Sequence, residues 1–221
     1  MTGPQVKIRI WDAPVRIFHW SIVGLMGLSW WSVEQGDMEL HQWSGITVLT
    51  LVLARILWGF YGSSTARFRH FLVGPGRMIM YLSAIAARKV PPVAGHTPTG
   101  GWMIVLLLLL ILLQPTLGLF ATDDILFEGP LYGFVSQELS YTLTALHKSL
   151  FNILLVSAGL HILAALYYQF ILREKIIPPM VTGWRLWHAP LPRPLQFINP
   201  LWALLTLGIV GAVVYQVILS S

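Results

Sequence analysis

Five stretches of the chain are almost entirely apolar and about as long as a bilayer is thick. They cover residues 17–33, 41–61, 102–121, 147–172 and 199–219. A hydrocarbon core of roughly 30 Å requires about 20 apolar residues per crossing helix, so we predict five transmembrane helices. Only 10% of the 221 residues are charged and 56% are apolar, which excludes an ordinary water-soluble domain. The sequence therefore predicts an all-α integral membrane protein that forms one membrane domain over residues 1–221.

The segments between these spans separate by charge. Twelve basic residues lie in the segments before residue 17, at 62–101 and at 173–198: Lys7, Arg9, Arg16, Arg67, Arg69, Arg77, Arg88, Lys89, Arg173, Lys175, Arg185 and Arg193. Seven acidic residues lie in the 34–40 turn and the 122–146 loop: Glu34, Asp37, Glu39, Asp123, Asp124, Glu128 and Glu138. The positive-inside rule makes the basic side cytoplasmic. We therefore expect a multi-pass membrane protein, surrounded by lipid, with its N-terminus on the cytoplasmic side and its C-terminus facing the periplasm or exterior. Topology accounts for the net charge of +5 without a nucleic-acid partner.

A shorter apolar stretch, residues 78–87, cannot cross a bilayer. Because it lies between Arg77 and Arg88, we expect an interfacial helix on the basic side of the membrane. A helix within an ordinary loop is the alternative.

Four of the seven histidines lie within or at the ends of predicted spans, where ionisable groups are costly and are functional hypotheses by default. The direction of each span gives their depth. His19 and His161 lie near the cytoplasmic face, and His41 and His147 lie near the external face. His147 and His161 are fourteen residues apart, nearly four turns, so both project from one face of their helix. Each level therefore has two imidazoles on different helices.

Two histidines on facing helices are a way in which a helical bundle holds haem iron. The chain has no cysteine, which excludes disulfides, iron–sulfur clusters and thioether-attached haem. The pattern predicts two non-covalent b-type haems, one ligated by His19 and His161 and the other by His41 and His147. A zinc or copper site would need ligands at one depth, and these are split across the membrane. For any single histidine, the alternative is a hydrogen-bonded core residue.

Two arginines are candidate partners for haem propionates. Arg55 lies fourteen residues after His41, at the depth of the inner histidine pair and on nearly the same helix face. Arg16 lies one turn before His19. The alternatives are that Arg55 extends to the cytoplasmic interface and that Arg16 is an ordinary basic residue at the inner boundary.

Several segments together resemble the bacterial cytochrome b561 family. They are IWDAPVRIFHW (10–20), HQWSGITVLTLVLARILWGFYG (41–62), GLFATDDILFEGPL (118–131), LHKSLFNILLVSAGLHILAALYY (146–168) and MVTG (180–183). Within the family, the chain resembles the b-type cytochrome subunits of nickel–iron hydrogenases and of periplasmic c-type cytochromes. The resemblance implies a four-helix haem-binding bundle over about 10–183, with the helix at 199–219 in addition. It also implies that His19, His41, His147 and His161 are the haem ligands.

The resemblance also implies the expected function, which is electron transfer across the membrane between a periplasmic redox partner and the quinone pool. No catalytic residue is predicted, and whether the chain is an enzyme by itself stays open. The acidic external segments favour a basic partner such as a c-type cytochrome, although topology alone also explains the acidity. A superoxide-oxidising quinone reductase is the alternative function, which the external acids disfavour because they repel an anion. A membrane scaffold without redox chemistry is a third possibility.

Overall fold

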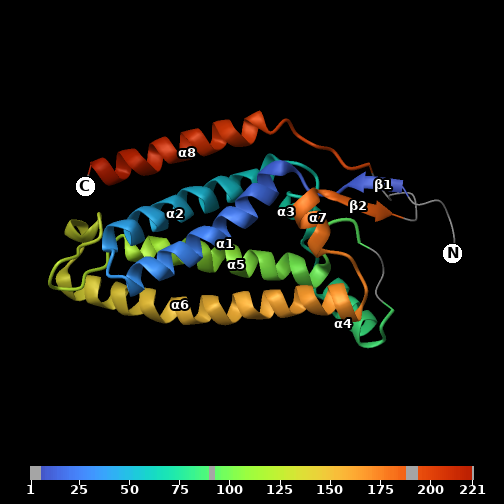
Figure 1. Cartoon of the computed structure of the whole chain (residues 1–221), viewed down its shortest axis with the longest axis horizontal. Coiled ribbons are helices and arrows are strands. Elements are labelled where there is room, and N and C mark those ends of the chain that lie inside the picture. Colours follow the sequence, from blue (N-terminus) through green and yellow to red (C-terminus); the bar gives the residue numbers. More distant parts are fainter. Residues whose placement is uncertain (1–5, 90–92, 188–193, 221) are drawn as a thin grey trace. The chain divides into compact units, whose positions relative to one another are not determined.

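The computed structural model describes residues 6–89, 93–187 and 194–220. The elements, labelled in Figure 1, are β1 (Val6–Arg9), α1 (Ala13–Glu34), α2 (Met38–Tyr61), α3 (Phe68–Phe71), α4 (Pro75–Ala86), α5 (Pro98–Gly118), η1 (Tyr132–Phe134), α6 (Gln137–Leu166), η2 (Tyr167–Ile171), α7 (Ile177–Thr182), β2 (Trp184–Trp187) and α8 (Leu201–Leu219). One of the predicted cytoplasmic basic residues, Arg193, lies outside the described residues.

Four helical segments within the described residues are long and apolar enough to cross a membrane: Met38–Tyr61, Pro98–Gly118, Gln137–Ile171 and Leu201–Ile218. They correspond to four of the five spans predicted from hydropathy. An all-α membrane protein with several crossings is therefore confirmed.

The first predicted span, 17–33, lies within α1. This helix has 22 residues, which at about 1.5 Å per residue is long enough for a bilayer core. It is less apolar than the other four segments, because Arg16, His19 and three serines interrupt its sequence. The fifth crossing stays a prediction.

The largest difference from the predicted boundaries is at the start of α6. This helix begins at Gln137, ten residues before the predicted start at 147, so part of the predicted 122–146 loop is helical. The Oγ atom of Ser136 accepts the backbone N–H of Leu139 at 3.3 Å, which is an N-cap contact. Hydropathy detects only the membrane-buried part of a helix, and this first portion is polar. The short helix predicted at 78–87 is present as α4, which begins earlier because Pro75 starts it.

The chain divides into two compact units. The first contains the described residues of 1–17, 57–106 and 159–203, and the second contains those of 18–56, 107–158 and 204–221.

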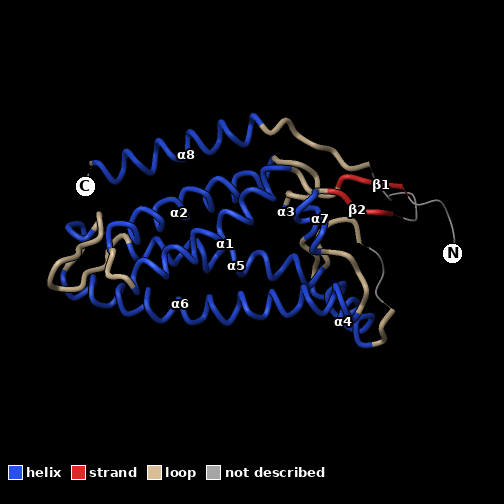
Figure 2. The backbone as a smooth tube through the Cα atoms, in the orientation of Figure 1, coloured by secondary structure: helices blue, strands red, loops and turns tan. Residues whose placement is uncertain are grey.

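In the first unit, β1 pairs with β2 as a small antiparallel sheet, with Val6 opposite Trp187 and Arg9 opposite Trp184 (Figure 2). Hydropathy did not predict these four-residue strands. The carbonyl of Gly183, directly before β2, accepts the N–H groups of Ile10 and Trp11 at 2.8 and 3.2 Å. Two of the segments that carry the family resemblance, 10–20 and 180–183, are thus in direct contact.

Asp12 fixes the beginning of α1 in this unit. Its side chain is 1% exposed, and its carboxylate accepts the N–H of Val15 at 2.9 Å and the indole N–H of Trp58 at 3.0 Å. The first contact caps the helix, and the second ties it to the end of α2. Ile10, Trp11, Val15, Trp58 and Ala66 form the buried cluster around this carboxylate.

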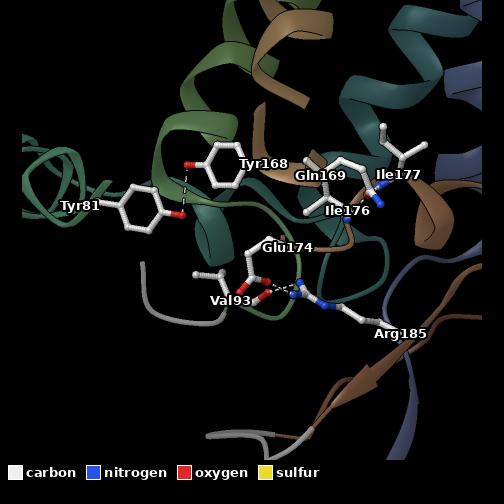
Figure 3. A network of polar contacts seen from close by, with 8 residues as sticks. All are labelled: Tyr81, Val93, Tyr168, Gln169, Glu174, Ile176, Ile177 and Arg185. Carbon is white, nitrogen blue, oxygen red and sulfur yellow. Dashed lines mark hydrogen bonds and ion pairs between the residues drawn. The ribbon is translucent and has the colours of Figure 1, made fainter. Parts of the chain in front are cut away.

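A second polar network in the first unit joins α4 to the end of the long helix (Figure 3). The Tyr168 hydroxyl, in η2, donates to the Tyr81 hydroxyl at 3.3 Å, and burial followed by this contact raises the pKa of Tyr81. Glu174 forms an ion pair with Arg185, which also donates to the carbonyl of Val93 at 3.3 Å. These contacts join α4 to η2, and they join β2 to Glu174 and to the backbone at Val93.

In the second unit, side-chain contacts join neighbouring helices. The Oγ atom of Ser29 on α1 lies 3.0 Å from Nδ1 of His41 on α2, and Gln114 on α5 contacts His147 on α6. A Cβ atom placed on Gly211 of α8 would lie 3.7 Å from the Thr50 methyl group of α2. Segments of α1, α2, α5 and α6 lie side by side in this unit (Figure 1).

Candidate functional site

The structure brings His41 and His147 together within the second unit. Their ring centroids are 6.0 Å apart, and the ring planes are nearly perpendicular, at 88°. His41 comes from the first turn of α2 and His147 from the middle of α6, so two helices that are far apart in sequence supply the pair. The two histidines predicted to lie at the same level are therefore neighbours.

Both imidazoles are oriented by backbone carbonyl groups. Nδ1 of His41 lies 2.9 Å from the Ser29 carbonyl oxygen, and Nδ1 of His147 lies 2.7 Å from the Gln114 carbonyl oxygen. Because a carbonyl oxygen only accepts hydrogen bonds, each Nδ1 carries the proton and donates it. Each Nε2 then keeps its lone pair, and this is the arrangement that metal-ligating histidines adopt.

The distance between the rings is suitable for one metal ion between them. Imidazole nitrogens bind metals at about 2.0–2.1 Å, so rings at this separation would have room to bind one metal ion in common. The observed separation is 6.0 Å. Among the described residues there is no group of three or more metal-ligating side chains. A two-histidine set with the remaining ligands supplied by a macrocycle is what haem iron uses.

A cavity of about 370 Å³ opens beside the two histidines. Its wall comes from α1, α2, α5, α6 and the loop after α5, and apolar side chains such as Ile111, Phe151 and Leu154 dominate it. Lys148, Glu34 and Asp123 are the charged residues among those that line it. A mostly apolar cavity with a few polar groups is typical of cofactor sites.

Gly118, at the end of α5, allows His147 to lie close to the backbone. A Cβ atom at this position would be 3.1 Å from Cε1 and 3.3 Å from Nδ1 of the ring. Gly45 lines the same cavity, and a Cβ atom there would meet nothing within 4 Å. Nothing in the sequence pattern points to Ser29, Gln114 or Gly118. Their roles depend on which carbonyl groups and Cα atoms face the histidines after packing.

A multi-pass helical membrane protein with a paired-histidine cavity between its helices has the features of a membrane cytochrome. The model of the prokaryotic cytochrome b561 family matches residues 10–183, and the chain therefore belongs to this family. It is a membrane b-type cytochrome of electron transfer, and members of its family bind haem b. No curated protein and no solved structure gives a significant match to the chain.

The other two predicted ligands are both half-buried. His19 is on α1 in the second unit, where its ring lies edge-on to Trp20 with the centroids 4.9 Å apart. His161 is on α6 in the first unit. Their predicted pairing stays a prediction.

The two predicted propionate partners differ in their surroundings. Arg55, on α2, is only 5% exposed, so its guanidinium group lies within the protein. Arg16 donates through Nη1 to the carbonyl of Val181 at 2.5 Å, and its buried Nε has no hydrogen-bond partner among the described residues. The Nε–H group of Arg16 could therefore donate a hydrogen bond to an acidic group of a ligand.

Proposed function

We propose that the chain is a di-haem cytochrome b of the bacterial inner membrane. It carries electrons across the membrane between a periplasmic redox partner, a c-type cytochrome or a hydrogenase-like protein, and the quinone pool. The observation that carries this proposal is the His41–His147 pair, with its 6.0 Å ring separation and with both Nδ1 atoms held by carbonyl oxygens.

In the external site, His41 and His147 would hold the iron through their Nε2 atoms. The carbonyl groups of Ser29 and Gln114 keep both rings in the required tautomer and orientation. The Gln114 amide nitrogen lies 3.3 Å from Nε2 of His147, so this side chain would turn aside when the ligand nitrogen is used. A haem bound here supplies reversible one-electron chemistry.

In the inner site, His19 and His161 would hold the second iron. Support comes from the depth of each residue in its span and from the fourteen-residue spacing of His147 and His161 along one helix. The buried charge of Arg55 and the free Nε donor of Arg16 would neutralise the propionates.

The proposed orientation follows from the distribution of charged residues. The basic segments would face the cytoplasm, together with the N-terminus, and the acidic segments would face the periplasm together with the C-terminus. The inner site would then exchange electrons with a quinone, and the external site with the periplasmic partner. In the alternative function, superoxide would have to approach through an acidic surface that repels it, and this disfavours the alternative.

Haem analysis of histidine variants tests the proposal. The purified protein should contain two b haems per chain by pyridine haemochrome analysis. His147→Ala and His161→Ala should each remove one haem and leave the other reducible. His70→Gln is the matched control, because the His70 ring lies outside the proposed sites, with Nδ1 2.8 Å from the Ser64 carbonyl. Zero or one haem in the unmutated protein, or two in both alanine variants, would refute the proposed ligands.

A further inference from the structure

The loop after α5 ends in an apolar tip. Within residues 6–89, 93–187 and 194–220, no other large apolar side chain is as exposed as Ile125, at 83%, and Leu126, at 92%. We propose that this tip, in the loop 122–128, is the docking surface for a basic protein partner. That this partner is a redox protein rests on the proposed function.

The loop is held in a fixed shape by its own polar groups. Oδ1 of Asp123 accepts the backbone N–H groups of Ile125, Leu126 and Phe127 at 3.0, 2.9 and 2.8 Å. These contacts lower the pKa of the Asp123 carboxyl group, so it stays ionised at neutral pH. Thr122 and Glu128 pair as an isolated antiparallel bridge at the base of the loop. The two apolar side chains are therefore presented outward by a preorganised backbone, which reduces the entropy lost on binding.

The charges beside the tip indicate what covers it. Asp123, Asp124 and Glu128 are all exposed in the same short segment. Carboxylates are costly in the hydrocarbon region, and anionic headgroups repel them. An apolar centre with a charged rim is the usual anatomy of a protein interface. A partner with a small apolar depression surrounded by lysines or arginines is complementary to this surface in both respects.

The loop is connected to the His41–His147 site. Thr122, Asp123 and Phe127 line the same cavity as the two histidines. In addition, the N–H of Thr122 donates to Oγ1 of Thr144, one turn before His147 on α6, at 3.1 Å. A protein bound to the tip would therefore lie beside the cavity that contains His41 and His147. A redox partner that exchanges electrons with this site needs such a position.

A spin label tests where the tip lies and what it touches. The chain has no cysteine, so Leu126→Cys gives a single labelling site in the holoprotein. In nanodiscs of zwitterionic lipid, a water-soluble nickel chelate should accelerate the spin relaxation of the label more than oxygen does, because the label is expected in water and not in lipid. A basic mono-haem cytochrome c is the probe partner, and at low salt it should immobilise the label. Leu139→Cys, an exposed position in the first turn of α6, is the matched control and should respond much less.

A binding measurement separates the apolar tip from the acidic rim. Combining Ile125→Ser with Leu126→Ser should raise the dissociation constant for the same cytochrome about tenfold. The reason is that a few central side chains carry most of the binding energy of a protein interface. Phe134→Ser, which removes a different exposed apolar side chain in the second unit, should leave the constant unchanged. If the double variant binds as tightly as the unmutated protein, the rim alone attracts the partner and the proposal is wrong.

Two label results would also overturn the proposal. A label relaxed by oxygen and shielded from nickel would make the tip a membrane anchor. A label that stays mobile while cytochrome c immobilises position 139 would place docking elsewhere. The haem content of the same samples is measured separately, so a failure of the proposed function is distinguished from a failure of this docking surface.

Discussion

Replacing Gly118 by alanine tests how closely His147 is positioned. The added Cβ atom would lie 3.1 Å from Cε1 of the ring, where ordinary contacts begin at 3.4 Å, so the ring must move by a few tenths of an ångström. This movement lengthens the 2.7 Å contact between Nδ1 and the Gln114 carbonyl. Removing contacts of this kind lowers metal affinity about 10- to 100-fold. Because Gly118→Ala weakens the contact without removing it, we expect about a tenfold faster loss of the external haem.

The assay is transfer of haem from the purified holoprotein to excess apomyoglobin, followed by absorbance. Gly45→Ala is the matched control, because it adds the same methyl group to the same cavity where nothing lies within 4 Å. Both changes alter helix propensity in the same direction. If Gly118→Ala retains haem as long as Gly45→Ala does, close packing of His147 against α5 does not hold the cofactor, and the account of this site fails.

Three further predictions concern charge and topology. Converting five external acids to their amides, namely Asp37, Glu39, Asp123, Asp124 and Glu128, should slow haem oxidation or reduction by a basic cytochrome c in stopped flow, chiefly through the association rate. The difference should vanish near 1 M salt, where the Debye length is about 3 Å; a salt-independent defect would contradict steering. A reporter fused to the C-terminus should be active only as a periplasmic reporter, and a cytoplasmic signal would mean that one predicted span does not cross. The pKa of Asp123 is lower in the folded loop than in an unfolded chain, so its stabilising effect is present at neutral pH and is lost as the pH falls through that lowered pKa. Amide exchange of Ile125, Leu126 and Phe127 should then accelerate relative to neighbouring amides, and uniform protection down to acidic pH would refute the role of this carboxylate.

Much of the helical architecture was predictable because a bilayer imposes one length and one polarity on every crossing segment. The spans near 41–61, 102–121 and 199–219 agree closely with α2, α5 and α8. Hydropathy failed where a helix leaves the membrane, as in the polar start of α6 at Gln137. It also missed β1 and β2, because two four-residue strands that lie far apart in the sequence leave no periodic pattern.

The proximity of His41 and His147 was predictable for a related reason. The direction of each span gives the depth of its histidines in the membrane. Only His41 and His147 were predicted near one face, so they could be paired without knowledge of how the helices pack. The groups that orient them could not be found in this way. Ser29 and Gln114 act through carbonyl oxygens, which every residue has, and Gly118 acts through the absence of a side chain. Such roles are visible only after the helices have been placed together.

Electron transfer across a sealed bilayer tests the central claim most directly. The holoprotein would be reconstituted into vesicles that contain trapped ferricyanide, and dithionite would be added outside. Bleaching of the trapped ferricyanide should be much faster than in protein-free vesicles. It should fall to the protein-free rate in His147→Ala and in His161→Ala, because each variant removes one of two consecutive redox sites. Transfer that is equally fast in both variants, or no acceleration by protein carrying two haems, would contradict the proposed conduit.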